Sequence, residues 1–397
     1  METVIMSRSV IVAAKRSPVG KFLGTLSSLP APQIGAAVAK DILQSVDCPA
    51  DSADLAVVGQ VLQAGVGQNP ARQVALKAGL APSVTAVTVN QVCGSGLRAV
   101  MDADNNIRLG QADVALAGGI ENMSSAPHYL HGLRTGAVKF GNASMADGML
   151  LDGLTCPFEG WAMGCAADYT AEKYKVTRED QDRFAVESHQ RAAAAQGAGH
   201  FKPEITSIEV PARKKTIVFD ADETIRPDAS IEGLAKLRPA FGKDGTATAG
   251  NASQLADGAA MLLLASEARA AERGWKPRAT ILSHTTFGVP PKELFYAPVG
   301  AVRQAVEKAG LKLSDIDLFE INEAFSSQMV ACIRGLEIDE ARVNIYGGGV
   351  ALGHPIGASG ARILVTLINA LEQRDAHRGV AALCLGGGNA VAMVIER

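Results

Sequence analysis

The sequence lacks the features that mark membrane, secreted and nucleic-acid-binding proteins. None of its apolar runs approaches the ~20 residues that span a bilayer, and the longest covers residues 259–265. Neither end carries a recognisable targeting signal. Lys and Arg number 38 against 41 Asp and Glu, a net charge of −3, so no basic nucleic-acid-binding face is predicted. We therefore expect a cytoplasmic protein with neither nucleic acid nor membrane as a partner.

Cysteine is sparse as well, and its spacing excludes two kinds of site. The paired spacing of a zinc site and the density of a disulfide framework are both missing, so we expect free thiols and no metal. The cysteines are Cys48, Cys93, Cys156, Cys165, Cys332 and Cys384. Glycine, in contrast, is abundant at 41 of 397 residues, without the period of collagen, and its clusters need local explanations.

Short β-branched runs alternate with alanine-rich amphipathic stretches along the chain. Residues 9–14 and 55–58 are predicted strands, and residues 36–45 and 302–309 are predicted helices. This alternation is typical of an α/β fold with helices on both faces of a sheet. The length corresponds to two or three domains at ~150 residues each.

Two matches at nearly one offset predict an internal duplication. The segment Asp51-Ser-Ala-Asp-Leu55 corresponds to Ser314-Asp-Ile-Asp-Leu318, and Ser95-Gly-Leu-Arg98 corresponds to Ser359-Gly-Ala-Arg362. Further on, Ala112-Asp-Val-Ala-Leu-Ala-Gly-Gly119 corresponds to Val380-Ala-Ala-Leu-Cys-Leu-Gly-Gly387. A fixed offset between similar segments is the signature of a repeated unit.

The segment between the repeats differs from them in composition, and we interpret it as an inserted loop domain. A helix is predicted over 177–196, with Thr177 as its N-cap. The predicted organisation is a first half over 1–120 completed by about 249–270, a loop domain over 121–248 and a second half over 271–397. The basic run Arg213-Lys214-Lys215 is predicted to be a solvated turn, with binding of a phosphorylated ligand as the alternative.

Residues 85–99 are predicted to form a strand, a tight glycine turn and a helix, with Cys93 in the turn. A thiol beside a helix N-terminus has a lowered pKa and N–H donors for a developing oxyanion, as a nucleophile requires. A small cysteine buried at a strand end is the alternative, and the glycine that follows favours the nucleophile. The same turn, Gly94-Ser-Gly-Leu-Arg-Ala99, also matches a dinucleotide fingerprint, but residues 114–117 run into glycines where that site needs an acid.

The equivalent turn of the second repeat carries His354, so a Cys–His pair across the pseudo-twofold axis is geometrically natural. Cys384 lies at the end of the last repeat's strand and is followed by glycines whose N–H groups can approach a ligand. Asn322 follows another predicted strand at the point where the chain leaves the sheet. These residues are predicted to form one site with Cys93.

At these positions the sequence resembles the thiolase family over essentially the whole chain. The matching motifs are Asn90-Gln-Val-Cys-Gly-Ser-Gly96, Ala249-Gly-Asn-Ala-Ser253, Asn322-Glu-Ala-Phe325, Gly353-His-Pro-Ile-Gly-Ala-Ser-Gly360 and Cys384-Leu-Gly-Gly-Gly388. The resemblance implies two βαβαβαββ halves in a five-layer αβαβα arrangement, a loop domain over the acyl-CoA, and a homodimer or homotetramer.

The resemblance also implies a role for each residue of the site. Cys93 is similar to the nucleophile that takes the acyl group, and His354 to the base that activates it. Cys384 is similar to the second acid/base, which works on the α-proton. Asn322, through a water, and His354 resemble the oxyanion hole for the enolate, and the N–H groups of Cys93 and Gly386 resemble the one for the tetrahedral intermediate. No metal and no cofactor are implied, because coenzyme A is itself substrate and product.

For coenzyme A, the resemblance implies a pantetheine site, an adenine site and a thioester pocket. The corresponding residues are Ser253 and Ala249 for pantetheine, Arg226 for adenine, and Leu154, Met163, Phe241, Ala324 and Phe325 around the thioester, with Leu294 closing the acyl pocket beside them. One position departs from the family, since Ala162 precedes Met163 where many short-chain members have a histidine. That departure removes a polar partner for the pantetheine arm.

The implied activity is that of an acetyl-CoA C-acetyltransferase, which condenses two acetyl-CoA to acetoacetyl-CoA and CoA and catalyses the reverse thiolysis. A degradative 3-ketoacyl-CoA thiolase of broader chain length is the alternative. A thiolase-fold carrier without turnover has no reason to keep Cys93, His354 and Cys384 together. A decarboxylating ketoacyl synthase resembles a Cys-His-His site and is disfavoured by Cys384.

Overall fold

The computed structural model describes residues 8–213 and 215–397 and has two similar halves separated by an insertion. The first half contains β1 (Ser9–Arg16), β2 (Gly20–Lys21), α1 (Ala31–Ser45), β3 (Leu55–Gly59), α2 (Pro70–Lys77), β4 (Thr85–Val89), α3 (Ser95–Arg108) and β5 (Val114–Asn122), then β10 (Ala256–Ser266) and α7 (Glu267–Arg273) after the insertion. The second half contains β11 (Ala279–Gly288), η3 (Pro291–Tyr296), α8 (Ala297–Lys308), η4 (Leu313–Asp315), β12 (Leu318–Ile321), α9 (Ser326–Leu336), η5 (Glu340–Arg342), α10 (Gly349–Leu352), α11 (Ile356–Arg374), β13 (Arg378–Leu385) and β14 (Asn389–Glu396).

Both halves arrange their strands in the same order. In the first half β3 lies in parallel between β4 and β5, and β10 runs antiparallel between β5 and β1. In the second half β12 and β13 are parallel, and β14 runs antiparallel between β13 and β11. The counterpart of β4 is reduced to one parallel bridge between Phe319 and Val343. Leu55 and Leu318 begin equivalent strands, so the predicted duplication is confirmed.

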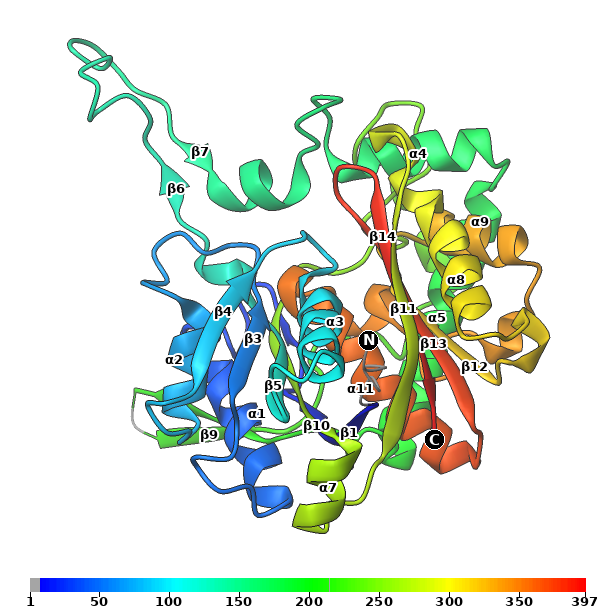
Figure 1. Ribbon diagram of the computed structural model, residues 1–397. Coiled ribbons are helices and arrows are strands. Elements are labelled where there is room, and N and C mark those ends of the chain that lie inside the picture. Colours follow the sequence, from blue (N-terminus) through cyan, green and yellow to red (C-terminus); the bar gives the residue numbers. More distant parts are fainter. Residues whose placement is uncertain (1–7, 214) are drawn as a thin grey trace.

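The halves join where β1 pairs with β11 over two residue pairs, Val10 with Thr280 and Ile11 with Ala279. Helices α1 and α2 cover the outer face of the first half-sheet, and α8 covers that of the second. Helices α3 and α11 lie between the half-sheets and contact strands of both (Figure 1). This is the five-layer αβαβα arrangement that the sequence predicts. None of the described helices is long and apolar enough to cross a membrane.

Two helices begin five residues earlier than the sequence pattern predicts. Helix α1 begins at Ala31 instead of residue 36, and α8 begins at Ala297 instead of residue 302. Each helix has a proline in its first turn, Pro32 or Pro298. The missing N–H of a proline costs nothing there, because the first N–H groups of a helix have no intrahelical acceptor. The predicted starts, which fall after both prolines, were therefore wrong.

The central helices α3 and α11 cross at glycines. A Cβ added to Gly360 would lie 2.4 Å from the backbone nitrogen of Leu97, and one added to Gly96 would lie 2.8 Å from that of Ala361. Any side chain at these positions would separate the helices, because real Cβ atoms do not approach a backbone that closely. The glycine-rich turns that precede both helices are thereby brought to one end of the molecule.

The insertion supplies the elements that surround this end. It contains η1 (Met123–Ser125), β6 (His128–Tyr129), β7 (Ala146–Asp147), a π-helical turn η2 (Leu150–Leu154), α4 (Met163–Lys173), α5 (Arg178–Ala198), β8 (Ile208–Ala212), β9 (Lys215–Phe219) and α6 (Ile231–Ala235). Helix α5 begins after Thr177, the predicted N-cap, which forms a capping box with Asp180, and it ends at Ala198, two residues beyond the predicted end at 196. Of the basic run, Arg213 is exposed in the β8–β9 turn, while Lys214 lies outside the described residues.

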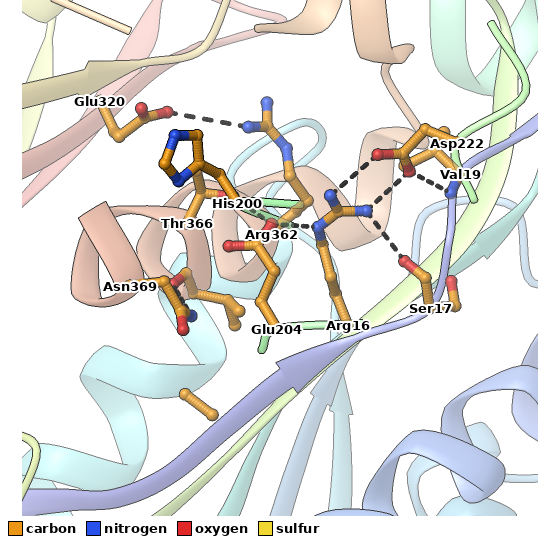
Figure 2. Close-up of polar contacts among 12 residues, drawn as sticks. Arg16, Ser17, Val19, His200, Glu204, Asp222, Glu320, Arg362, Thr366 and Asn369 are labelled. Atoms are coloured by element: carbon orange, nitrogen blue, oxygen red, sulfur yellow. Dashed lines mark hydrogen bonds and ion pairs between the residues drawn. The ribbon is translucent and has the colours of Figure 1, made fainter. Parts of the chain in front are cut away.

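Buried charges attach the insertion to the central layers (Figure 2). Arg16 of β1 pairs with Glu204 at 2.6 Å and with Asp222 at 2.7 Å, and Thr366 of α11 donates to the same Glu204 at 3.1 Å. Burial alone would lower the pKa of Arg16, but its two carboxylate partners raise it. Removing one partner of such a pair leaves a buried charge uncompensated, at a cost of about 3–5 kcal/mol. The insertion is thus held at a defined position over the central helices.

Candidate active site

The four turns that the sequence singles out meet at the carboxyl ends of the parallel strands. Cys93 lies between β4 and α3, and Asn322 follows β12 directly. His354 lies between α10 and α11, and Cys384 lies at the end of β13. Parallel α/β sheets bind ligands outside these strand ends, where loops from different strands converge.

The backbone before Cys93 is strained in a way that presents the thiol. Val92 has φ of 48°, a left-handed conformation that is unfavourable for a β-branched residue. Outliers of this kind concentrate at functional sites, where the surrounding structure imposes them. On the other side of Cys93, a Cβ at Gly94 would lie 2.4 Å from the side chain of Leu385, so this glycine lets the turn approach the β13–β14 turn. The nucleophile candidate is held against the strand end that carries Cys384.

The pKa of the Cys93 thiol is raised and not lowered, so the sequence-based expectation on this point was wrong. Burial raises this pKa to about 11, although hydrogen bonds from the backbone N–H groups of Gly386 and Cys93 act in the opposite direction. Desolvation outweighs these donors because a thiolate in an apolar cavity loses the solvation of bulk water. Cys93 therefore rests as a neutral thiol, and its activation needs a base.

His354 is oriented so that its Nε2 atom can act as that base. Its Nδ1 atom lies 2.6 Å from Ser359 Oγ, which also lies 2.9 Å from the carbonyl oxygen of Pro355. A hydroxyl has one proton, and Ser359 donates it to the carbonyl, so its oxygen accepts from His354 Nδ1–H. Nε2 is then left without a proton in the neutral ring. This hydroxyl thus selects the base-competent tautomer of the buried histidine.

Burial lowers the pKa of His354 to about 3, and the positive charge of Arg362 contributes in the same direction. Arg362 lies on α11 and belongs to the buried charge cluster drawn in Figure 2. The imidazole is therefore neutral at the pH of any cell interior. Cys93 and His354 rest as a thiol and a neutral imidazole.

Asn322 lies beside this base but does not line the cavity. Its Nδ2 atom is 3.4 Å from His354 Nε2, and its Oδ1 atom is buried without a hydrogen-bond partner among the described residues. An unpaired buried amide oxygen costs roughly 1–3 kcal/mol unless a donor reaches it. Asn322 therefore has an amide group with an unpaired oxygen beside the Nε2 atom of His354.

Cys384 shares the cavity with Cys93. Burial raises its pKa well above the ordinary value, and the neighbouring thiols of Cys93 and Cys332 add to the effect. It packs in an apolar cluster with Leu294, Phe295 and Phe325. A neutral thiol in such surroundings can exchange a proton with a carbon acid but carries no resting charge.

One cavity of about 390 Å³ contains most of the predicted residues. It is lined by Cys93, His354, Cys384 and Gly386, and by Leu154, Met163, Phe241, Ala249, Ser253, Leu294, Ala324 and Phe325. Ala162, the residue that departs from the family pattern, also lines it. Nowhere among residues 8–213 and 215–397 do three or more His, Cys, Asp or Glu gather in an arrangement that could hold a metal ion. The cavity combines an extended apolar wall with two thiols and an imidazole.

Arg226 is the one substrate-binding candidate that lies outside this lining. It is exposed, and its guanidinium donates to Gln254 Oε1 at 2.8 Å. Gln254 itself lines the cavity, so Arg226 lies at the rim. Its assignment to the adenine stays a prediction.

The sequence analysis missed Ser359 as a functional residue, although the signal was present. Ser359 is the repeat counterpart of Ser95, and Ser95 Oγ bonds to the backbone of the Cys93 turn, with Val92 O at 2.6 Å. Both serines therefore support the catalytic turn that precedes their own helix. Phe295 and Leu150, which complete the apolar wall, were also missed, because their spacing in the sequence carries no motif.

The chain is similar to known proteins over almost its whole length. Residues 9–268 match the thiolase N-terminal domain, and residues 275–397 match the thiolase C-terminal domain. An acetyl-CoA acetyltransferase of Pseudomonas aeruginosa is 51% identical over 99% of this chain and 100% of its own length, and one of Escherichia coli is 48% identical with the same coverage. A crystal structure of the Bacillus anthracis acetyl-CoA acetyltransferase superposes with a TM-score of 0.97 at 41% identity, covering 99% of this chain and 100% of that one.

Replacing Ser359 should slow the reaction of Cys93 with an electrophile. In Ser359→Ala the Nδ1–H of His354 loses its acceptor, so the tautomer with a free Nε2 is no longer favoured and proton removal from the thiol weakens. We expect the rate of Cys93 alkylation by iodoacetamide, read by peptide mass spectrometry, to fall about tenfold or more. Ser283→Ala, which removes another buried hydroxyl bonded to a carbonyl, is the control and should react like the wild type. An unchanged rate in Ser359→Ala would show that the hydroxyl does not orient the base.

Proposed function

The chain belongs to the thiolase family, and from this premise we propose that it is an acetyl-CoA C-acetyltransferase. It condenses two acetyl-CoA to acetoacetyl-CoA and CoA and catalyses the reverse thiolysis through an acetyl group on Cys93. The observation that carries the proposal is the meeting of Cys93, His354 and Cys384 in one apolar cavity of about 390 Å³. A binding protein or carrier has no use for two thiols and a base at one point.

The first half-reaction loads the acetyl group. Cys93 Sγ attacks the thioester carbonyl while its proton moves to His354 Nε2. The transfer accompanies bond formation, because the pKa of the resting thiol, raised to about 11, lies far above that of the imidazole, lowered to about 3. The N–H groups of Cys93 and Gly386, which point to the sulfur, are placed to stabilise the developing oxyanion. CoA leaves as a thiolate and takes the proton of Cys384, so that His354 keeps its proton on Nε2 and Cys384 is left as a thiolate.

The second half-reaction makes the carbon–carbon bond. The Cys384 thiolate removes the α-proton of a second acetyl-CoA, and the resulting enolate attacks the acetyl group on Cys93. A carbon acid beside a thioester is far weaker than a thiol, so the enolate oxygen needs preorganised donors in a dry site. The Nε2–H of the protonated His354 is one donor, and a water held by the otherwise unpaired amide oxygen of Asn322 is the other. Cys93 leaves as a thiolate and takes its proton back from His354.

The proposed reaction uses coenzyme A as substrate and product and needs no other cofactor. We assign Ser253 and Ala249 to the pantetheine arm, and Phe241 and Ala324 to the surroundings of the thioester; all four line the cavity. We also assign the enzyme to the cytoplasm, because a nucleophilic thiol persists in a reducing compartment, and all six cysteines are free.

The acyl pocket should favour short chains. Leu154, Met163, Leu294 and Phe325 are bulky and line the cavity, so a long acyl tail must displace packed side chains. In thiolysis assays followed by loss of the magnesium-enolate absorbance, we expect kcat/KM for acetoacetyl-CoA to exceed that for 3-ketooctanoyl-CoA by about tenfold or more, which corresponds to ~1.4 kcal/mol.

Because of Ala162, a result without preference for the short substrate would also be informative. A small residue in the wall, where relatives carry histidine, leaves room for a longer or branched chain. Comparable kcat/KM values for the two substrates would favour the degradative 3-ketoacyl-CoA thiolase. Absence of thiolysis with both substrates would contradict the enzyme assignment altogether.

The two cysteines should separate the half-reactions. Cys384→Ala should still gain the mass of one acetyl group on Cys93 when mixed with acetyl-CoA, because CoA can also leave as a thiolate without a proton from Cys384. Condensation should fall by about 10²-fold or more, because the α-proton then has no base. Cys93→Ala should gain no acetyl group. Cys332→Ala, another buried thiol of the same region, is the matched control and should retain both half-reactions. Equal loss of both half-reactions in Cys384→Ala would indicate a structural role.

We further propose that the enzyme is a homodimer or homotetramer. Strand β4 lies at the edge of the sheet, pairs only with β3, and exposes 46% of Val87. An exposed apolar edge strand is a ready template for pairing with a second copy. The excursion around β6 and β7 extends away from the body in Figure 1 and exposes Phe140 completely, together with Leu133 and Met145, which supports a further contact between dimers.

Sedimentation velocity tests this assembly. The wild-type chain should sediment as a dimer or tetramer, and Val87→Lys should shift it toward the monomer, because a charge on an edge strand opposes pairing. Leu109→Lys, which places a lysine at an exposed leucine after α3, is the control and should leave the distribution unchanged. A monomeric wild type at micromolar concentration would contradict the proposal.

A further inference from the structure

One polar cluster outside the cavity joins the insertion to the second half. Glu293 of η3 accepts a hydrogen bond from Tyr169 at 2.6 Å and another from Lys173 on its Oε1 atom. Its Oε2 atom accepts from Tyr174 at 3.1 Å. Tyr169 and Lys173 lie on α4, and Tyr174 caps the end of that helix. We call these four residues the Glu293 clamp.

The clamp holds both ends of η3. Glu293 is near the start of this short turn, and Tyr296, at its end, stacks on Tyr174 with ring centroids 4.1 Å apart. The ammonium of Lys173 lies 5.5 Å from the centroid of the same Tyr174 ring. Burial raises the pKa of Glu293, but its three donors more than offset this and lower it, so the carboxylate is charged when it accepts them. Charged acceptors make the stronger hydrogen bonds.

Between these two anchored ends lie two residues of the acyl pocket. Leu294 and Phe295 are buried at 1% and 2% exposure and line the cavity. Phe295 also contacts Phe325 across the cavity floor, with ring centroids 5.3 Å apart. Glu293 and Tyr296 therefore contact α4 and its C-cap, while the two residues between them line the cavity.

The opposite wall of the acyl pocket begins at the first residue of α4, the helix whose last turn the Glu293 clamp holds. Met163 is the first residue of α4 and lines the cavity, while Lys173 is the last. An α-helix is a stiff rod with a rise of about 1.5 Å per residue, so holding its last turn holds its first. Ala166 and Ala167 on the same helix pack in one apolar cluster with Leu294. The outer clamp thus determines how far apart Met163 and Leu294 stand.

We propose that Glu293 is a specificity-determining positioning residue, which limits the length of the acyl chain by fastening α4 to η3 and keeping the wall formed by Leu294 and Met163 closed. It touches neither substrate nor catalytic thiols and acts through Leu294. The proposal rests on the proposed function, because it refines the acyl specificity of the same cavity.

The test compares the ratio of kcat/KM for 3-ketooctanoyl-CoA to that for acetoacetyl-CoA, which is independent of the active fraction of each preparation. We expect Glu293→Ala to raise this ratio about threefold or more, and Glu293→Gln to raise it less, since an amide oxygen still accepts from tyrosine. Leu294→Ala should raise it directly. In the double variant the effects should not add, because Glu293 acts through Leu294.

Glu372→Ala is the matched control. Glu372 also accepts two side-chain hydrogen bonds, from Arg278 at 2.8 and 2.6 Å, but it is not among the described residues that line the cavity. Its removal should leave the ratio at the wild-type value. An unchanged ratio in Glu293→Ala, or an equal loss with both substrates, would overturn the proposal.

A second measurement does not depend on activity. Amide hydrogen exchange of the peptide that covers η3 should become faster in Glu293→Ala than in Glu372→Ala, because the turn is released from α4. Unchanged exchange there would overturn the proposal even if the wild type thiolysed neither substrate. Absence of thiolysis in the wild type, with faster exchange in Glu293→Ala, would instead contradict the proposed function and leave the clamp in place.

Discussion

The close crossing of α3 and α11 is the constraint on which the rest of the molecule depends. Gly96 and Gly360 allow the helices to approach so closely that a Cβ at either position would overlap the opposite backbone. Each helix is the continuation of a catalytic turn, one with Cys93 and the other with His354. The distance between nucleophile and base is therefore determined by backbone packing in the core, where displacement is costly, and not by mobile loops.

This depth in the protein also determines the resting chemistry. Both thiols have raised pKa values and the histidine has a lowered one, in each case chiefly because burial penalises the charged form. A site built this way stores no reactive thiolate between turnovers. Catalysis depends instead on groups that are already oriented, namely the N–H donor of Gly386 and the imidazole of His354, whose tautomer is set by Ser359. These groups stabilise charge where it develops during the reaction.

Substrate specificity depends on other parts of the chain than the reacting groups do. The turns with Cys93, Asn322, His354 and Cys384 belong to the two repeated halves, whereas most of the bulky acyl wall, with Leu154, Met163 and Leu294, comes from the insertion and from η3. Arg16, Glu204 and Asp222 anchor the insertion to the core through buried ion pairs, and the Glu293 clamp fastens it a second time near the acyl pocket. Separate anchoring allows the walls to change while the reacting groups stay in place.

The duplication, the α/β class and the candidates for the catalytic residues could be predicted from the sequence, because each depends on local signals. Residues at a fixed offset indicate a repeat, and a cysteine in a glycine turn before a helix indicates a candidate nucleophile. The early starts of α1 and α8 had a local signal too, in Pro32 and Pro298. The raised pKa of Cys93 and the orientation of His354 by Ser359 had none, because desolvation and hydrogen-bond partners depend on what surrounds a residue in space, and a linear pattern does not contain that information.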